Sequence, residues 1–259
     1  MRADVLQAVA IACHSCAFLA GESARPPEIL SGTSFGEVHE IQFERKANGK
    51  LAPGVIADSI GPWLKKLAKE GVIRLEVSLA ICPWNPFDAI SEPWGILTDG
   101  DVGVEVWQPA WKKRIRSHSD PAPWGVMYSA SRSGRWAVHA AYSLCDASKL
   151  LRSAVAQTSS SHPLLAALQG DSPPSSDVFP ATWPAERRGI GGLAARTLTL
   201  LRSEEWARVL FSGGLSPAAY ESVSRRLWAA AIMALEASAN LRESAAERPR
   251  GPRSHQLTG

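Results

Sequence analysis

The sequence predicts an α+β fold, in which a mostly antiparallel twisted sheet of about five or six strands packs against helices and a C-terminal helical subdomain follows. Stretches with period-two alternation cluster between residues 38 and 142, and helical periodicity dominates on either side. Seven of the ten tryptophans also fall between residues 63 and 136. Because an indole carries a large apolar area, this concentration favours a thick core under the sheet over an aromatic-lined surface.

The composition is that of a globular protein with little overall charge. Of the 259 residues, 45% are hydrophobic and 20% are charged, which is enough to bury a sizeable core. The net charge of +3 is too small to predict nucleic-acid binding, so any electrostatic case depends on local clusters. No apolar run reaches the roughly 20 residues of a spanning helix, and the four cysteines are scattered. We therefore expect a cytoplasmic protein.

The first 24 residues combine an apolar run with polar interruptions. Asp4, Gln7 and His14 break the run and a basic start is almost absent, so a secretory signal is the less favoured interpretation. The spacing instead predicts an amphipathic helix that packs on the body through one face, formed by Leu6, Val9, Cys13, Cys16 and Ala20.

The central region reads as strands around one helix. Residues 38 to 45 alternate as a half-buried strand, and a helical face covers residues 54 to 70, with Gly61-Pro62 indicating a kink or a late start and Gly71 at the C-cap position. Residues 72 to 81 form the clearest strand. Asp99-Gly100 joins a hairpin of residues 94 to 98 and 101 to 107, and a second hairpin joins 124 to 130 with 135 to 142.

The C-terminal part is predicted to be helical. Asp146 is expected to be the N-cap of the helix that closes an α+β domain of residues 1–157, and the Ser/Pro-rich residues 158–184 are expected to be a linker. A helical subdomain over 185–241 contains helices at 185 to 201, at 203 to 212 and from Pro217 onward, with Ser216 as cap. The small residues of the last helix allow close packing and a homodimer through it, and residues 242–259 are predicted to be a disordered tail.

A C-x-x-C pair, Cys13 and Cys16, is the first candidate for chemistry. Two thiolates at this spacing can hold zinc or exchange a disulfide, but no second paired motif completes a zinc site. Core packing on the apolar helix face is the favoured interpretation, with zinc and redox chemistry as alternatives.

Two acidic groups are also candidates for metal binding. Glu44-Arg45-Lys46 has the Glu-x-Lys form of metal-dependent nucleases but lacks a well-placed upstream carboxylate, so a solvated strand face is favoured. Asp99, Asp101 and Glu105 form an acidic cluster that turn chemistry explains in part. No hydrolase, metalloprotease or nucleotide-binding motif is present, so we expect no catalytic residues, no metal and no cofactor.

The best candidate for binding is a basic stretch beside two tryptophans. Basic side chains neutralise phosphates or carboxylates, and neighbouring rings stack on bases. Arg132 and Arg135 on the second hairpin are expected to extend the patch. The alternative without a binding function is a solvated loop over buried tryptophans. The predicted site consists of Trp107, Trp111, Lys112, Lys113, Arg114, Arg116, Arg132 and Arg135.

The sequence thus favours a non-catalytic binding or adaptor protein whose basic-aromatic surface engages an anionic partner, either nucleic acid or an acidic protein. One alternative is an enzyme, in its sharpest form a metal-dependent nuclease that uses Glu44, Lys46, Glu76 and Asp101. Another is a secretion chaperone or immunity-type protein whose sheet surface captures another protein. No motif assigns the chain to a family.

Overall fold

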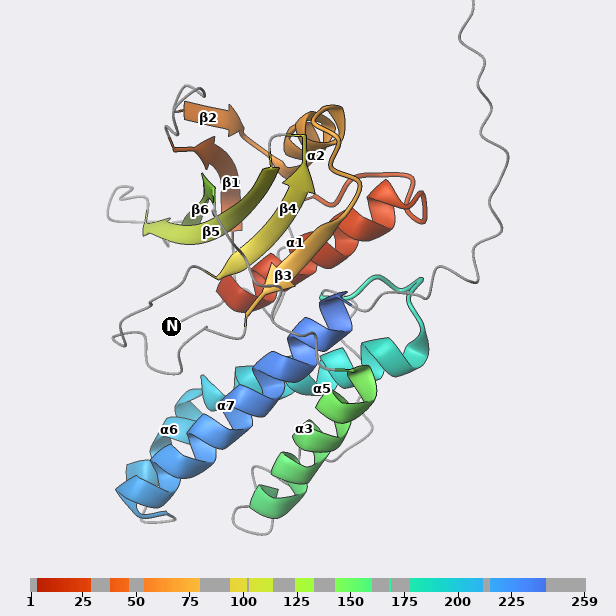
Figure 1. Cartoon of the computed structure of the whole chain (residues 1–259). Coiled ribbons are helices and arrows are strands. Elements are labelled where there is room, and N and C mark those ends of the chain that lie inside the picture. Colours follow the sequence, from red (N-terminus) through yellow and green to blue (C-terminus); the bar gives the residue numbers. More distant parts are fainter. Residues whose placement is uncertain are drawn as a thin grey trace, which may run out of the picture.

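A computed structural model describes residues 4–28, 38–46, 54–79, 94–101, 103–113, 124–132, 143–159, 168, 178–211 and 215–240. In these ranges six strands form a single mixed sheet and six helices pack beside it or follow it (Figure 1). The predicted α+β class is confirmed, and most neighbouring strands are antiparallel.

The first helix and the strands occupy the N-terminal half of the chain. They are α1 (Asp4–Leu19), β1 (Val38–Arg45), β2 (Gly54–Ala57), α2 (Ile60–Lys69), β3 (Leu75–Ser78), β4 (Gly95–Gly100), β5 (Gly103–Lys113) and β6 (Trp124–Arg132). Four more helices follow: α3 (Leu144–Ser159), α5 (Ala185–Leu201), α6 (Glu204–Phe211) and α7 (Pro217–Asn240).

The strands lie in the order β2-β1-β6-β5-β4-β3. The parallel pair is β1 and β6, which pair from Val38 opposite Trp124 to Arg45 opposite Ala130. One face of the sheet, here called the inner face, lies against α1 and α2 and holds alternate residues of every central strand. These residues are buried and include Ile41, Phe43, Val77, Ile96, Trp107, Val126 and Tyr128.

Residues 54 to 70 form a strand and a helix, which corrects the single predicted helix. Gly54–Ala57 is β2, and α2 starts only at Ile60, after Ser59 in an extended conformation. Pro62 therefore falls in the first helical turn, where its missing N–H needs no partner. Gly71, with φ +78°, follows the helix in the left-handed conformation that glycine adopts readily. The late start and the glycine at the helix end are both confirmed.

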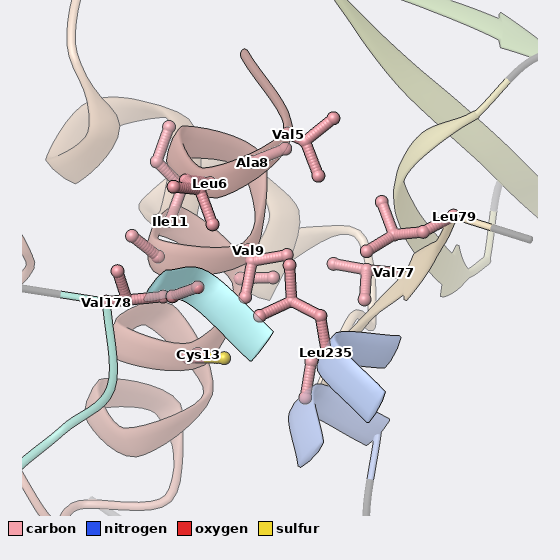
Figure 2. Packing of buried hydrophobic residues seen from close by; sticks show 14 of the residues in the cluster. Val5, Leu6, Ala8, Val9, Ile11, Cys13, Val77, Leu79, Val178 and Leu235 are labelled. Carbon is pink, nitrogen blue, oxygen red and sulfur yellow. The ribbon is translucent and has the colours of Figure 1, made fainter. Parts of the chain in front are cut away.

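Helix α1 is buried on nearly all sides, which the sequence did not predict. Every residue from 5 to 13 exposes 2% or less of its surface. Figure 2 shows the helix among Val77 of β3, Leu79 directly after that strand, Leu235 of α7, and Val178. The helix itself is confirmed, but packing through one face is wrong. The absence of charged residues between Asp4 and Glu22 was the available signal, because a helix that is apolar all round is a buried one.

The C-terminal helices follow the predicted boundaries closely. The N–H of Ala219 donates to Oγ of Ser216 at 3.2 Å, so Ser216 caps α7 as predicted. Helix α3 is capped by Ser143 and not by Asp146. The Asp146 N–H donates to Oγ of Ser143 at 3.1 Å, and that hydroxyl donates back to the Asp146 carboxylate at 2.6 Å. Asp146 is thus the third helical residue, where a carboxylate also favours the helix start.

Part of the predicted linker contributes to the core. Val178 and Phe179 are completely buried, and Trp183 is buried as well. Phe179 packs so closely on α5 that a Cβ on Gly191 would lie 2.3 Å from its ring. Residues 160–167, 169–177 and the predicted tail lie outside the described residues, and the division into domains stays a prediction. None of the described helices is long and apolar enough to cross a bilayer.

Strand β3 ends the sheet, and side chains from two helices occupy its outer edge. Asn240 accepts a hydrogen bond from the Val77 N–H at 2.8 Å and donates one to the Val77 carbonyl at 2.7 Å. The N–H of Leu79 donates to Glu236 at 2.8 Å, and the Cys16 thiol donates to the Leu75 carbonyl at 3.0 Å. The backbone groups of this edge are therefore bound within the chain, a common way to keep an edge strand from pairing with another protein.

We expect Asn240→Ala to lower the free energy of unfolding by about 1 to 3 kcal/mol, because both backbone groups of Val77 lose their partner in a partly buried position. Urea unfolding followed by circular dichroism measures the change. Gln157→Ala on α3 is the control, because the hydrogen bonds of the Gln157 side-chain amide are exposed to solvent. Equal stability of N240A and the wild type would contradict this role.

Candidate functional site

Strand β5 carries four of the eight predicted binding residues (Trp107, Trp111, Lys112 and Lys113), and it places Trp107 in the core. The strand continues to Lys113, whereas the sequence predicted its end at residue 107. The Trp107 side chain is completely buried on the inner face, and its indole N–H donates to Oγ1 of Thr98 at 3.0 Å. Trp107 is therefore a core residue in this structure and offers no ring to a partner.

Trp107 belongs to a cluster of four buried rings, here called the aromatic cluster. Trp63 of α2 stacks on Phe43 of β1 with ring centroids 4.1 Å apart, and Tyr128 of β6 stacks on Phe43 at 5.3 Å. Trp107 meets Trp63 edge to face at 5.3 Å. The Tyr128 hydroxyl and Oε1 of Gln7 on α1 are 3.2 Å apart. The cluster thus joins α1, α2 and three strands, as the core interpretation of the tryptophans predicts.

Trp111 lies four residues further along β5, on the same face of the strand as Trp107, and is only half-buried. It packs against the edge of the core, while the neighbouring Ala110 is exposed. Lys112 and Lys113 are the last residues of β5. Their side chains, and all of Arg114 and Arg116, lie outside the described residues. Between residues 106 and 119 the sequence holds these four positive charges and no negative one.

Arg132 lies at the other end of the sheet from Lys113. The β5–β6 ladder runs from Lys113 opposite Trp124 to Glu105 opposite Arg132. Its ends are eight residues apart along β6 (124 to 132), or about 27 Å at roughly 3.4 Å per residue. The backbone of Arg132 therefore does not adjoin Lys112 and Lys113, and Arg135 lies outside the described residues. The candidate basic surface narrows to residues 112 to 116, here called the basic segment.

A second feature of the inner face is a buried arginine that is paired with two glutamates. Arg45 at the end of β1 exposes 5% of its side chain and lies between two glutamates. Its Nε donates to Glu105 of β5 at 2.9 Å, and its Nη1 donates to Glu70 at the end of α2 at 2.8 Å. The guanidinium carbon is 5.7 Å from the ring centre of Trp107. Arg45, Glu70 and Glu105 are here called the ion cluster.

The ion cluster favours the charged forms of Arg45 and Glu70. The hydrogen bonds that Arg45 donates lower the pKa of Glu70, and its positive charge lowers that pKa further. Partial burial of the carboxylate acts in the opposite direction but is the smaller effect. The hydrogen bonds that Arg45 donates to Glu70 likewise raise the pKa of Arg45 above its ordinary value. Each guanidinium nitrogen donates to a carboxylate, so the cluster is a satisfied internal link between α2, β1 and β5.

Sequence analysis placed Glu44-Arg45-Lys46 on a solvated face and missed the inward direction of Arg45. The signal was the alternation of the strand itself, since Arg45 shares the parity of Ile41 and Phe43, which are buried. Glu44 and Lys46 do lie on the partly or fully exposed side, as predicted. Glu105, which was grouped with Asp101 in an acidic cluster, is buried against Arg45, whereas Asp101 is exposed.

The sheet order separates the residues of the nuclease alternative. Glu44 is on β1 and Glu76 is on β3, with β6, β5 and β4 between them, a distance of about 19 Å at roughly 4.8 Å per strand. Glu44 accepts a hydrogen bond from Oγ of Ser129, and Glu76 pairs with Arg74 at 3.4 Å. Two carboxylates this far apart cannot share one metal ion. Within the described ranges, no three His, Cys, Asp or Glu side chains are grouped so that they could hold one.

Cys13 of α1 is buried in the core and Cys16 is partly buried against it, which supports the packing interpretation. Burial raises the pKa of the Cys13 thiol well above its usual value, more than the nearby Arg187 lowers it. Burial also raises the pKa of Cys16, whose thiol donates to the Leu75 carbonyl. Thiols in this state are poor nucleophiles and poor metal ligands, because both roles require the thiolate.

A comparison of the chain with protein-family models, with curated proteins and with solved structures finds no match.

Proposed function

We propose that the protein is a non-catalytic binding protein that engages an acidic partner protein through the basic segment, residues 112 to 116. The observation that carries the proposal is that four of the five residues directly after the half-buried Trp111 are positively charged, with no acidic residue between 106 and 119. Because Lys112 and Lys113 pair with β6 at the end of a ladder that runs from Glu105 to Lys113, their backbone is anchored before any partner binds. Such preorganisation lowers the entropic cost of association.

An acidic protein is favoured over nucleic acid. Binding to single strands uses exposed rings on which bases stack, but Trp107 is buried and Trp111 is half-buried in the edge of the core. Carboxylates require only the cationic side chains, which act at short range.

A labelled polyglutamate peptide tests the proposal by fluorescence anisotropy. The variant replaces Lys112, Lys113, Arg114 and Arg116 with glutamine. At about 0.5 kcal/mol for each of the four charges, we expect its affinity to fall about 30-fold. Binding by the wild type should also weaken steadily as salt is raised.

A matched control removes the same net charge elsewhere. Lys65, Lys69, Arg152 and Arg226 are exposed on α2, α3 and α7, so their replacement by glutamine should leave binding almost unchanged. Equal losses in both variants, or binding that salt does not affect, would contradict the proposal. Tighter binding of a mixed single-stranded oligonucleotide would favour the nucleic-acid alternative, and ion-dependent cleavage lost on Glu44→Ala would favour the nuclease.

A further inference from the structure

We draw no further inference here: the strongest candidate, the half-buried polar row of Glu44, Ser129 and Gln108 across β1, β6 and β5 on the face of the sheet that lies away from α1 and α2, carries nothing because nothing among the described residues shows what covers that face.

Discussion

Replacing Arg45 with methionine is expected to lower the free energy of unfolding by about 3 to 5 kcal/mol. The substitution leaves the Glu105 carboxylate, which is almost completely buried, without the guanidinium that it faces at 2.9 Å. Removing one member of a buried ion pair is far more costly than removing the whole pair, since an unpaired charge stays in a medium that solvates it poorly. Urea unfolding at pH 7, followed by tryptophan fluorescence and circular dichroism, measures the loss.

A double variant separates the lost charge pairing from lost packing. Adding Glu105→Leu to Arg45→Met should recover a large part of the stability, because the buried carboxylate is then absent. A double variant less stable than Arg45→Met alone would contradict this account of the ion cluster.

The pH dependence provides an independent check with a defined sign. Glu70 has a lowered pKa in the folded state, so it contributes to the free energy of unfolding at a pH above the pKa of an ordinary glutamate. This contribution is lost as the pH falls through the lowered pKa. Arg45 stays charged throughout, because its pKa is raised. We expect the wild type to lose stability below about pH 4, and Glu70→Gln should flatten that decline.

Replacing Trp107 with alanine is expected to cost about 3 to 5 kcal/mol of stability, because it removes a completely buried indole from the aromatic cluster. It also removes the indole N–H from which the Thr98 hydroxyl accepts a hydrogen bond at 3.0 Å. The same unfolding measurement reports the change, and Trp111→Ala, at the half-buried edge of the core, should cost clearly less.

The same variant tests where function resides on β5. Polyglutamate binding by the folded fraction of Trp107→Ala should match the wild type, because the buried ring makes no contact with a partner. A loss of binding without a loss of stability would show instead that Trp107 belongs to the binding surface.

Local periodicity was sufficient for most of the elements. The bounds of β1, α5 and α7 agree with the alternation or helical spacing read from the chain, because each combines a regular pattern with clear end signals such as Ser216-Pro217. The segment 54 to 70 failed because four residues of Gly-Val-Ile-Ala suit a strand and a helix equally well. Pairing with β1 decided between them, and the sequence does not contain that information.

The candidate site was predictable only as a stretch of sequence. The sequence shows the basic run from Lys112 to Arg116, and it shows that no acidic residue lies between 106 and 119. Whether Trp107 and Arg132 belong with it depends on which face β5 turns to the core and on its register with β6. A shift of one residue would exchange the two faces, so neither answer follows from composition.

The sequence by itself determined the α+β class, the core role of Trp63, Trp94 and Trp107 and the bounds of α5 and α7, since these depend on the apolar pattern along a few turns or one strand. Only the tertiary structure decided that α1 is enclosed on nearly all sides, that Arg45 joins Glu70 and Glu105, and that Asn240 closes the β3 edge. The physical reason is that these contacts join residues 25 to 163 positions apart. Their energies depend on the packing of the whole chain, and no local preference encodes them.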